Sequence, residues 1–464
     1  MEIKIADNLK TVECDVLIVN KFEGKSTSHE LVNEYLPESY KGKAGEVFLL
    51  HTHKKCPSTY ILTIGFGDEN KLDNNIIREN ISKAVKKCLE LKAKSIAIDI
   101  TSNQTNSIPA IIGAYIANYS FDKYKTKKDN KISEIYISQV SQEVVDISKT
   151  MAESMQFTRD LANEPAAYAT PTKLAEIAKN IDGVTTVVYD ENEIKELGMG
   201  AFLAVARGSK QPPKFIHMKY TPINPKKRIA IIGKGLCFDS GGLDIKPASS
   251  MLTMRDDMSG AACVLGVMKA LSKLNPQVEV HGIIAACENM PGCDAYKPGD
   301  ILTAKNGKTI EVDNTDAEGR LTLADALCYA CTIGVDEVID IATLTGACMV
   351  ALGNAASGIM GNSDDLVKDI IKVGSYCGEK FWELPMWQEY RDNMNSDIAD
   401  MKNTGTRYGG ASAAGMFLKE FVTDDVKWAH LDVAGTAFLE SPHKEFCKGA
   451  TGVGVRTLLN YIMV

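Results

Sequence analysis

The chain has 464 residues, which is long for a single hydrophobic core and predicts two domains. Hydrophobic residues make up 45% of the sequence and charged residues 24%, values typical of a globular protein with an ample core. The formal net charge of −8 argues against nucleic acid or an anionic membrane surface as the main partner.

The start of the chain and its cysteines favour a cytoplasmic protein. Residues 1–5 lack the charged-then-apolar layout of a signal peptide, and no apolar run is long enough to span a bilayer, so we expect no membrane contact. Most cysteines lie inside apolar segments, where they behave as small hydrophobes. Cys328 and Cys331 form a CxxC without the second pair of a zinc site, and we interpret them as core residues of a protein in a reducing compartment.

The first part of the chain alternates strand-like and helix-like segments. Short apolar runs rich in β-branched residues predict strands, and apolar residues at helical spacing predict helices. In chain order we expect strands at 15–20, 46–52 and 59–65, a helix at 75–93, a strand at 95–101, a helix at 108–120 and a strand at 132–140. This part of the chain contains no residue cluster that suggests chemistry.

A long amphipathic helix is expected next, at about 142–162, and the sequence Asn163-Glu164-Pro165 ends it. We place the domain boundary in its first turns, giving an N-terminal domain at 1–145 and a C-terminal domain at 146–464. The alternation then continues with strands at 228–238, 278–288 and 337–344 and helices at 259–274, 321–333 and 365–377. The predicted fold class is therefore α/β, with two domains that each contain a mostly parallel or mixed sheet flanked by helices.

The segment NTDAEGRL at 314–321 places two carboxylates and a guanidinium at alternate positions. Alternate side chains of an extended segment point the same way, so Asp316, Glu318 and Arg320 can converge on one point. Two close carboxylates repel each other unless a cation lies between them, and a metal ion would leave Arg320 free to hold an anion. An isolated DxExR is more often a solvated acidic turn, so the rest of the chain must decide between the two interpretations.

A second polar cluster follows the strand expected at 228–238. Its GxG at 233–235 invites a dinucleotide-binding interpretation, but Phe238 stands where the third glycine of that fingerprint would have to be. The segment instead offers Lys234, Asp239, Lys246 and Asp257 near the carboxyl end of a strand, where open α/β sheets bind ligands. The plainer alternatives are a helix cap for Asp257 and ordinary surface charge for the lysines.

Together the two clusters contain four carboxylates, which two divalent cations would neutralise. Paired metals activate a water molecule for hydrolysis, and an oxygen-rich site without histidine favours Mn²⁺ or Zn²⁺, with Mg²⁺ as a further candidate. No HExxH, GxSxG or Cys/His metal pair competes for this role, and we interpret His430 as structural. The sequence therefore predicts a two-metal hydrolytic site at Asp239, Asp257, Asp316 and Glu318.

At this point the sequence resembles the cytosolic leucyl aminopeptidases, a family of two-metal exopeptidases. The octapeptide at 314–321 matches the most specific motif of that family without change. The resemblance is dense over the second half and loose over the first, and it includes YKPGD at 296–300, NGKT at 306–309, ATLTGA at 342–347, GGA at 409–411, residues 428–435 and GATG at 449–452. Cys237, Asp256 and the loop at 249–253 depart from the usual pattern.

The resemblance implies a role for each site residue. Asp239 and Glu318 would bridge two divalent metals, Asp316 would complete one metal site, and Lys234 and Asp257 would complete the other. The lysine ligand must be a neutral amine, which makes metal loading dependent on pH. Lys246 would stabilise the developing oxyanion, and Arg320 would hold a bicarbonate that acts as general base towards the water bridging the metals. The set expected around the first substrate residue is Met254, Thr343, Leu344 and Gly346.

The resemblance also implies the activity and the assembly. We expect a catalytic C-terminal domain that removes leucine and other apolar residues from the N-termini of short peptides. The N-terminal domain would be non-catalytic and contribute contacts in a homohexamer. Two alternatives remain: a cysteinyl-glycine dipeptidase role, and a DNA-binding regulatory role, against which the acidic charge balance argues.

Overall fold

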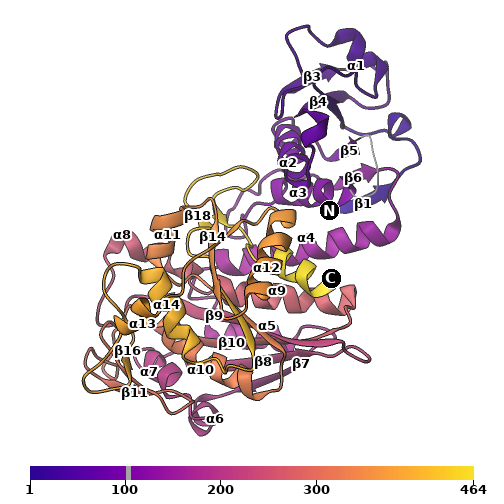
Figure 1. Ribbon diagram of the computed structural model, residues 1–464. Coiled ribbons are helices and arrows are strands. Elements are labelled where there is room, and N and C mark those ends of the chain that lie inside the picture. Colours follow the sequence, from indigo (N-terminus) through magenta and orange to yellow (C-terminus); the bar gives the residue numbers. More distant parts are fainter. Residues whose placement is uncertain (101–105) are drawn as a thin grey trace. The chain divides into compact units, whose positions relative to one another are not determined.

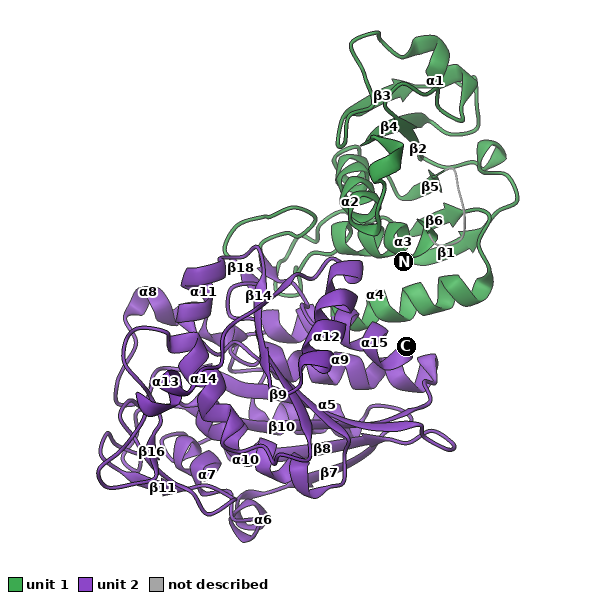
Figure 2. Cartoon of the chain, in the orientation of Figure 1, with its two compact units in different colours: residues 1–156, 440–448 green, residues 157–439, 449–464 purple. Residues whose placement is uncertain are grey.

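The computed structural model describes residues 1–100 and 106–464 and divides the chain into two compact units (Figure 2). Unit 1 comprises Met1–Gln156 and Glu440–Lys448, and unit 2 comprises Phe157–Leu439 and Gly449–Val464. The chain first passes from unit 1 to unit 2 within α4 (Gln142–Asn163), the long helix expected from the sequence. Among the described residues, no helix combines the length and the apolar character that a membrane span requires.

Unit 1 is built on a six-stranded sheet with the strand order β1-β6-β5-β2-β4-β3 (Figure 1). Every neighbouring pair is parallel except β3 with β4, which is antiparallel. The core contains the apolar side chains of β2, β4 and β5 together with those of α2 and α3. The elements are β1 (Glu2–Ile5), β2 (Val16–Phe22), α1 (Glu30–Tyr35), β3 (Val47–His51), β4 (Tyr60–Gly67), α2 (Asn74–Glu90), β5 (Ser95–Asp99), α3 (Ser107–Ala117) and β6 (Glu134–Ile137).

The first-half predictions agree with these elements to within a few residues. The exception is Thr101, the last residue of the strand predicted at 95–101, because it lies outside the described residues. Unit 1 also contains residues 440–448, in which the Glu445 carboxylate accepts a hydrogen bond from Arg78 Nε at 2.9 Å. No local sequence signal predicts the return of this distant segment to unit 1.

Unit 2 is built on an eight-stranded mixed sheet with the strand order β15-β14-β17-β13-β9-β10-β8-β7. The four central strands β17, β13, β9 and β10 are mutually parallel, while β8, β7 and β14 run antiparallel to their inner neighbours. Its strands are β7 (Thr185–Tyr189), β8 (Lys214–Tyr220), β9 (Lys227–Asp239), β10 (Val278–Asn289), β13 (Glu337–Ala342), β14 (Ser357–Gly361), β15 (Phe381–Glu383) and β17 (Lys427–Asp432).

Helices and short strands complete unit 2. Helix α9 (Ser259–Leu274) is apolar on almost every side because it packs on β9 and β10 and is itself covered by α15 (Val455–Met463). The other helices are α5 (Pro171–Lys179), α6 (Glu191–Glu196), α7 (Gly200–Ala206), α8 (Ala248–Met251), α10 (Gly319–Thr332), α11 (Gly346–Leu352), α12 (Asp364–Cys377), α13 (Gln388–Asp392) and α14 (Gly410–Lys419). The short strands are β11 (Ile301–Thr303), β12 (Thr309–Glu311), β16 (Met401–Lys402), β18 (Phe438–Leu439) and β19 (Gly449–Ala450).

The GxG at 233–235 lies inside strand β9, not in a turn that leads into a helix. Its glycines serve close packing, because a Cβ at Gly233 would lie 2.5 Å from the Gly260 backbone of α9. A Cβ at Gly260 would in turn lie 2.1 Å from the Ile341 carbonyl oxygen of β13. The glycines therefore let α9 approach the sheet closely, and the segment has none of the geometry of a dinucleotide site.

Candidate metal centre

The site lies where the central parallel strands of unit 2 end. Asp239 is the last residue of β9, Asn289 ends β10, Asp432 ends β17, and Thr343 directly follows β13. Because these four strands are neighbours and run in the same direction, their carboxyl ends meet at one edge of the sheet. This edge is the usual ligand-binding position of an open α/β sheet.

Lys234 is the buried cation at the centre of the first half of the site. Its ammonium group lies 2.8 Å from Asp257 Oδ1 and 3.0 Å from Glu318 Oε1, and it donates a hydrogen bond to the Thr343 carbonyl oxygen at 3.0 Å. The side chain passes over the start of α10, where a Cβ at Gly319 would lie 2.4 Å from Lys234 Cε. The glycine of the NTDAEGRL motif therefore makes room for Lys234.

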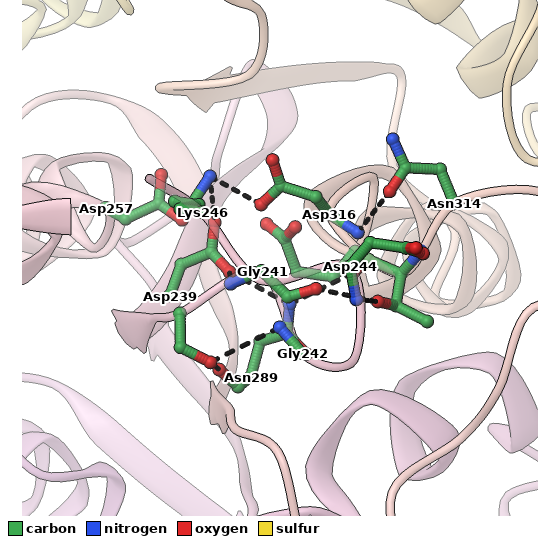
Figure 3. A network of polar contacts seen from close by, with 12 residues as sticks. Asp239, Gly241, Gly242, Asp244, Lys246, Asp257, Asn289, Asn314 and Asp316 are labelled. Atoms are coloured by element: carbon green, nitrogen blue, oxygen red, sulfur yellow. Dashed lines mark hydrogen bonds and ion pairs between the residues drawn. The ribbon is translucent and has the colours of Figure 1, made fainter. Parts of the chain in front are cut away.

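Lys246 is the cation of the second half. Its ammonium group lies 2.8 Å from Asp239 Oδ2 and 2.6 Å from Asp316 Oδ1, so it joins the strand cluster to the octapeptide (Figure 3). The Asp239 carboxylate also accepts hydrogen bonds from the Gly241 amide and from Asn289 Nδ2, each at 2.9 Å. These bonds hold the Asp239 carboxylate between the turn that follows β9 and the end of β10.

The carboxylates of the site fit a metal ion. One oxygen atom from each of Asp239, Asp316 and Glu318 lies within 4.8 Å of the others, close enough for all three to bind one small cation. Within the described part of the chain, the buried oxygens Asp257 Oδ2 and Glu318 Oε2 accept no hydrogen bond. A buried carboxylate oxygen without a partner is costly, and a bound cation would stabilise it.

The electrostatics of the site support the same conclusion. Four carboxylates face two ammonium groups, which leaves an excess of negative charge. Burial raises the pKa of the Asp257, Glu318 and Asp316 carboxyls. Burial alone would lower the pKa of both lysines, but the surrounding carboxylates raise it above the ordinary lysine value. All of these shifts favour added positive charge, so the site attracts cations.

Arg320 lies in the first turn of α10. It donates a hydrogen bond from Nη1 to the Asn403 carbonyl oxygen at 2.8 Å and lines a cavity of about 480 Å³. Burial lowers the pKa of the Arg320 guanidinium to about 10, which still leaves it charged at neutral pH. A guanidinium that faces a cavity beside a metal centre is a suitable group to hold a small anion.

The residues expected around the first substrate residue lie on the Lys234 side. Thr343 donates a hydrogen bond from Oγ1 to Asp257 Oδ1 at 2.7 Å, and Met254 begins the 3₁₀ turn that leads to Asp257. Gly346 is exposed at the start of α11, and a Cβ there would meet nothing within 4 Å. Of these residues, Thr343 contacts Asp257 directly, and Leu344 and Gly346 follow it in the loop that leads into α11.

Three further residues organise the site, and the sequence reasoning missed them. Asp432 accepts hydrogen bonds from the Leu344 amide at 3.3 Å and from Thr345 Oγ1 at 2.6 Å, which holds the loop after β13. Asn289 donates to Asp239, and Asn403 donates from Nδ2 to the Asn314 carbonyl oxygen at 2.7 Å. The strand-end rule could have identified Asn289, because it directly follows the strand predicted at 278–288, but no strand was predicted before Asp432.

His430 and Asp340 form a buried pair next to Trp428. His430 Nδ1 lies 2.5 Å from Asp340 Oδ1, and Trp428 Nε1 donates a hydrogen bond to Asp340 Oδ2 at 2.7 Å. All three side chains are inaccessible to solvent. This arrangement is consistent with the structural role that the sequence analysis assigned to His430.

The α/β fold and the carboxylate–lysine cluster at its strand ends define a metal-dependent hydrolase. Comparisons with known proteins give the family. The catalytic-domain model of the cytosol aminopeptidase family matches residues 156–459, and the N-terminal-domain model of the same family matches residues 26–128. The chain belongs to the cytosol aminopeptidase family, as the resemblance implied.

Two curated relatives match this chain over nearly its whole length. A protein of Aquifex aeolicus named "Probable cytosol aminopeptidase" is 43% identical, and the match covers 100% of this chain and 98% of the relative. A protein of the same name from Persephonella marina is 46% identical over 92% of this chain and 89% of the relative. Membership of this family makes the protein a metal-dependent aminopeptidase, and hence a peptidase hydrolase.

Two solved structures share the fold over nearly the full length. The bottromycin maturation enzyme BotP in complex with Mn has a TM-score of 0.90 and 30% sequence identity, covering 97% of this chain and 99% of its own. A mutant of tomato leucine aminopeptidase has a TM-score of 0.89 and 35% identity, covering 100% of this chain and 96% of its own. These structures confirm the predicted two-domain α/β fold.

Proposed function

We propose that the protein hydrolyses leucine and other apolar residues from the N-termini of short peptides. The observation that carries this proposal is the convergence of Asp239, Asp316 and Glu318 within 4.8 Å, with Lys234 and Lys246 paired to them. The structural relative named as a leucine aminopeptidase supports the substrate preference.

In the proposed site two divalent cations, Mn²⁺ or Zn²⁺ with Mg²⁺ as a further candidate, are held by the four carboxylates and Lys234. Asp239, which pairs with Lys246, and Glu318, which pairs with Lys234, are the residues to which the family resemblance gives contact with both cations. Asp316 would complete one metal site, and Asp257 with Lys234 would complete the other. When bound, the cations supply a bridging water as nucleophile and polarise the peptide carbonyl.

Two cationic side chains, those of Lys246 and Arg320, would assist the hydrolysis of the peptide bond. Lys246 sits between Asp239 and Asp316, where its charge can stabilise the oxyanion that develops on the attacked carbonyl. Arg320 would hold a bicarbonate that accepts the proton of the attacking water. The guanidinium is suited to this role because it is charged at neutral pH and lines the adjacent cavity.

The first residue of the peptide would lie on the Asp257 side of the site. Met254 offers an apolar side chain, and Gly346 leaves open space for an apolar substrate residue such as leucine. The Leu344 amide is fixed by Asp432, so the neighbouring carbonyl oxygens are held in place to accept a substrate N–H. These features favour a medium-sized apolar residue at the substrate N-terminus.

The assembly and location belong to the same proposal. We infer a homohexamer in which the N-terminal domain, taken as 1–145, contributes oligomer contacts and the catalytic domain spans 146–464. We infer a cytoplasmic location from the names of the relatives. The substrates would be short peptides, without membrane or nucleic acid as the main partner.

A substrate panel tests the proposed activity. With Mn²⁺ supplied, we expect the highest kcat/KM on leucine amide, with lower values on glycine and glutamate amides. A preference for cysteinyl-glycine over leucyl-glycine would indicate the dipeptidase alternative. A salt-resistant DNA gel shift without peptide hydrolysis would indicate the regulatory alternative.

Replacement of Arg320 by alanine should lower kcat for leucine amide by about 10- to 100-fold, less than loss of a metal ligand, because water and free bicarbonate can partly replace the held anion. Added bicarbonate should raise the rate of the Arg320→Ala enzyme more than that of the wild type. Steady-state kinetics across a bicarbonate series measure both effects. If Arg320→Ala lost as much activity as a metal-ligand variant and did not respond to bicarbonate, Arg320 would not be the residue that holds the bicarbonate.

A further inference from the structure

The segment at 240–252, which we call the Lys246 loop, connects β9 to the 3₁₀ turn before Asp257. Three of its apolar side chains are exposed, those of Leu243, Ile245 and Leu252. Burial of apolar surface within the chain therefore does little to fix the loop. Beyond Gly242, and apart from the ion pairs of Lys246, the loop is hydrogen-bonded to other described segments only through Asp244.

Asp244 lies next to the octapeptide and forms a reciprocal pair of hydrogen bonds with Thr315 (Figure 3). The Asp244 amide donates to Thr315 Oγ1 at 2.8 Å, and the Thr315 amide donates to Asp244 Oδ2 at 2.7 Å. The Thr315 hydroxyl also donates to the Gly241 carbonyl oxygen at 2.7 Å. Thr315 is thus bonded to both ends of the turn at 241–244.

Thr315 is a rigid point of attachment for this turn. Its side chain is inaccessible to solvent. Its carbonyl oxygen accepts hydrogen bonds from the Tyr296 hydroxyl at 2.6 Å and from Asn289 Nδ2 at 3.0 Å. Every polar group of Thr315 therefore has a partner, and the turn that contains Asp244 is attached to a buried, well-bonded part of the site.

The ion pairs of Lys246 alone would not hold its ammonium group once metal is bound. They join it to Asp239 and Asp316, and in the proposed site both carboxylates are also ligands of cations, which repel the ammonium. Asp244 stands two positions before Lys246. Thr315 directly precedes Asp316. Hydrogen bonds between Asp244 and Thr315 therefore fix the loop relative to the octapeptide without using either charged partner of Lys246.

We propose that Asp244 is a positioning residue, which holds the Lys246 loop in place so that the ammonium group meets the carbonyl of the substrate. The inference rests on the proposed aminopeptidase function and on the role proposed there for Lys246, and it adds a further residue to the site. A displacement of about 1 Å can cost about 10²-fold in rate. Asp244 acts through the acceptor oxygen of its carboxylate, because the group that it holds is the Thr315 amide.

Two substitutions of Asp244 test this role. Asp244→Ala removes the acceptor and should lower kcat for leucine amide by about 10-fold, with little change in KM or metal content. Hydrogen exchange of the amides at 241–252 should also become faster. Asp244→Asn keeps an acceptor oxygen and should retain most of the wild-type rate. Wild-type kcat and exchange in Asp244→Ala, or an equal loss of kcat in Asp244→Asn, would overturn the inference.

A double-mutant cycle shows whether Asp244 acts through Lys246. In an enzyme that already carries Lys246→Gln, Asp244→Ala should lower kcat no further, because the group that Asp244 positions is gone. If instead the two losses multiplied in the double variant, Asp244 would act independently of Lys246 and the inference would be wrong.

Asp336→Ala is the matched control. Asp336 is also exposed and also forms a reciprocal pair: it accepts a hydrogen bond from the Arg228 amide at 2.8 Å, and its own amide donates to the Arg228 carbonyl oxygen at 2.9 Å. These residues lie where β9 and β13 begin, at the edge of the sheet opposite the site. Asp336→Ala should lower the temperature of unfolding and leave kcat and the exchange at 241–252 unchanged.

The remaining outcomes identify which step of the reasoning fails. An equal loss of kcat in Asp336→Ala would show that the effect of Asp244→Ala is general destabilisation, and would overturn this inference alone. Wild-type kcat in Lys246→Gln would overturn the role of Lys246 and this inference with it. A wild-type enzyme that cleaves no leucine amide in the presence of Mn²⁺ would overturn the proposed function itself.

Discussion

Glu318→Gln is expected to abolish hydrolysis of leucine-p-nitroanilide, with kcat falling by more than about 10⁴-fold. Glu318 lies between the two halves of the site: one oxygen pairs with Lys234 at 3.0 Å, and the other is buried without a hydrogen-bond partner among the described residues. Glutamine keeps the shape of the side chain but removes the charge that would hold the cations. Steady-state kinetics together with metal analysis should therefore show loss of turnover and a lower metal content.

Asp325→Asn is the control, because it neutralises another buried carboxylate, in the helix α10 that directly follows Glu318. Asp325 is buried in α10 and accepts hydrogen bonds from the Phe202 and Lys305 amides at 2.8 Å, away from the cluster. Its replacement should lower the free energy of unfolding while the remaining folded protein keeps its turnover and metal. If Glu318→Gln turned over substrate at the wild-type rate, Glu318 would have no part in the site.

Lys246→Gln should lower kcat by about 10²- to 10³-fold with little change in KM and no loss of bound metal. The Lys246 charge lies between Asp239 and Asp316 at 2.8 and 2.6 Å, so it can act on charge that develops during the reaction without being required for metal binding. Lys246→Arg should recover part of the rate because it restores the positive charge.

Kinetics and metal analysis on the same preparations distinguish oxyanion stabilisation by Lys246 from a role in metal binding or in substrate binding. Loss of metal in Lys246→Gln would show that Lys246 organises the ligands instead of stabilising the reacting carbonyl. A rise in KM at constant kcat would show that it binds the substrate in its ground state.

Much of the fold and the central cluster could be predicted from sequence because their signals are local. Alternation of apolar strands and amphipathic helices located most elements of unit 1, the helix α4, and the elements β9, β10, β13, α9, α10 and α12 of unit 2, whereas β7, β8, β14, β17 and α14 were not predicted. The octapeptide placed Asp316 and Glu318 near each other by spacing alone. The assignment of Lys234, Asp239, Lys246 and Asp257 to the same site drew on the strand-end rule and the family resemblance, and the structure joins them through ion pairs.

Other features depend on contacts between distant segments. The bond from Asn403 to Asn314 joins two loop residues that are 89 positions apart in the sequence. Residues 440–448 return to unit 1, where Glu445 pairs with Arg78. The position of Asp432 beside the Leu344 amide depends on the pairing of β17 with β13. No periodicity or motif encodes such pairings. The cavity that Arg320 lines was missed for the same reason, because its wall comes from four separate segments.

Removal and return of metal is the most direct test of the central claim that the carboxylate–lysine cluster holds two catalytic cations. The purified protein is treated with a chelator, dialysed, and titrated with Mn²⁺ or Zn²⁺ while metal content per chain and leucine amide hydrolysis are measured together. The metal-free protein should be inactive, and activity should return as the content rises to two ions per chain. Full activity in protein that contains no metal, or binding of two ions without any return of activity, would contradict the account.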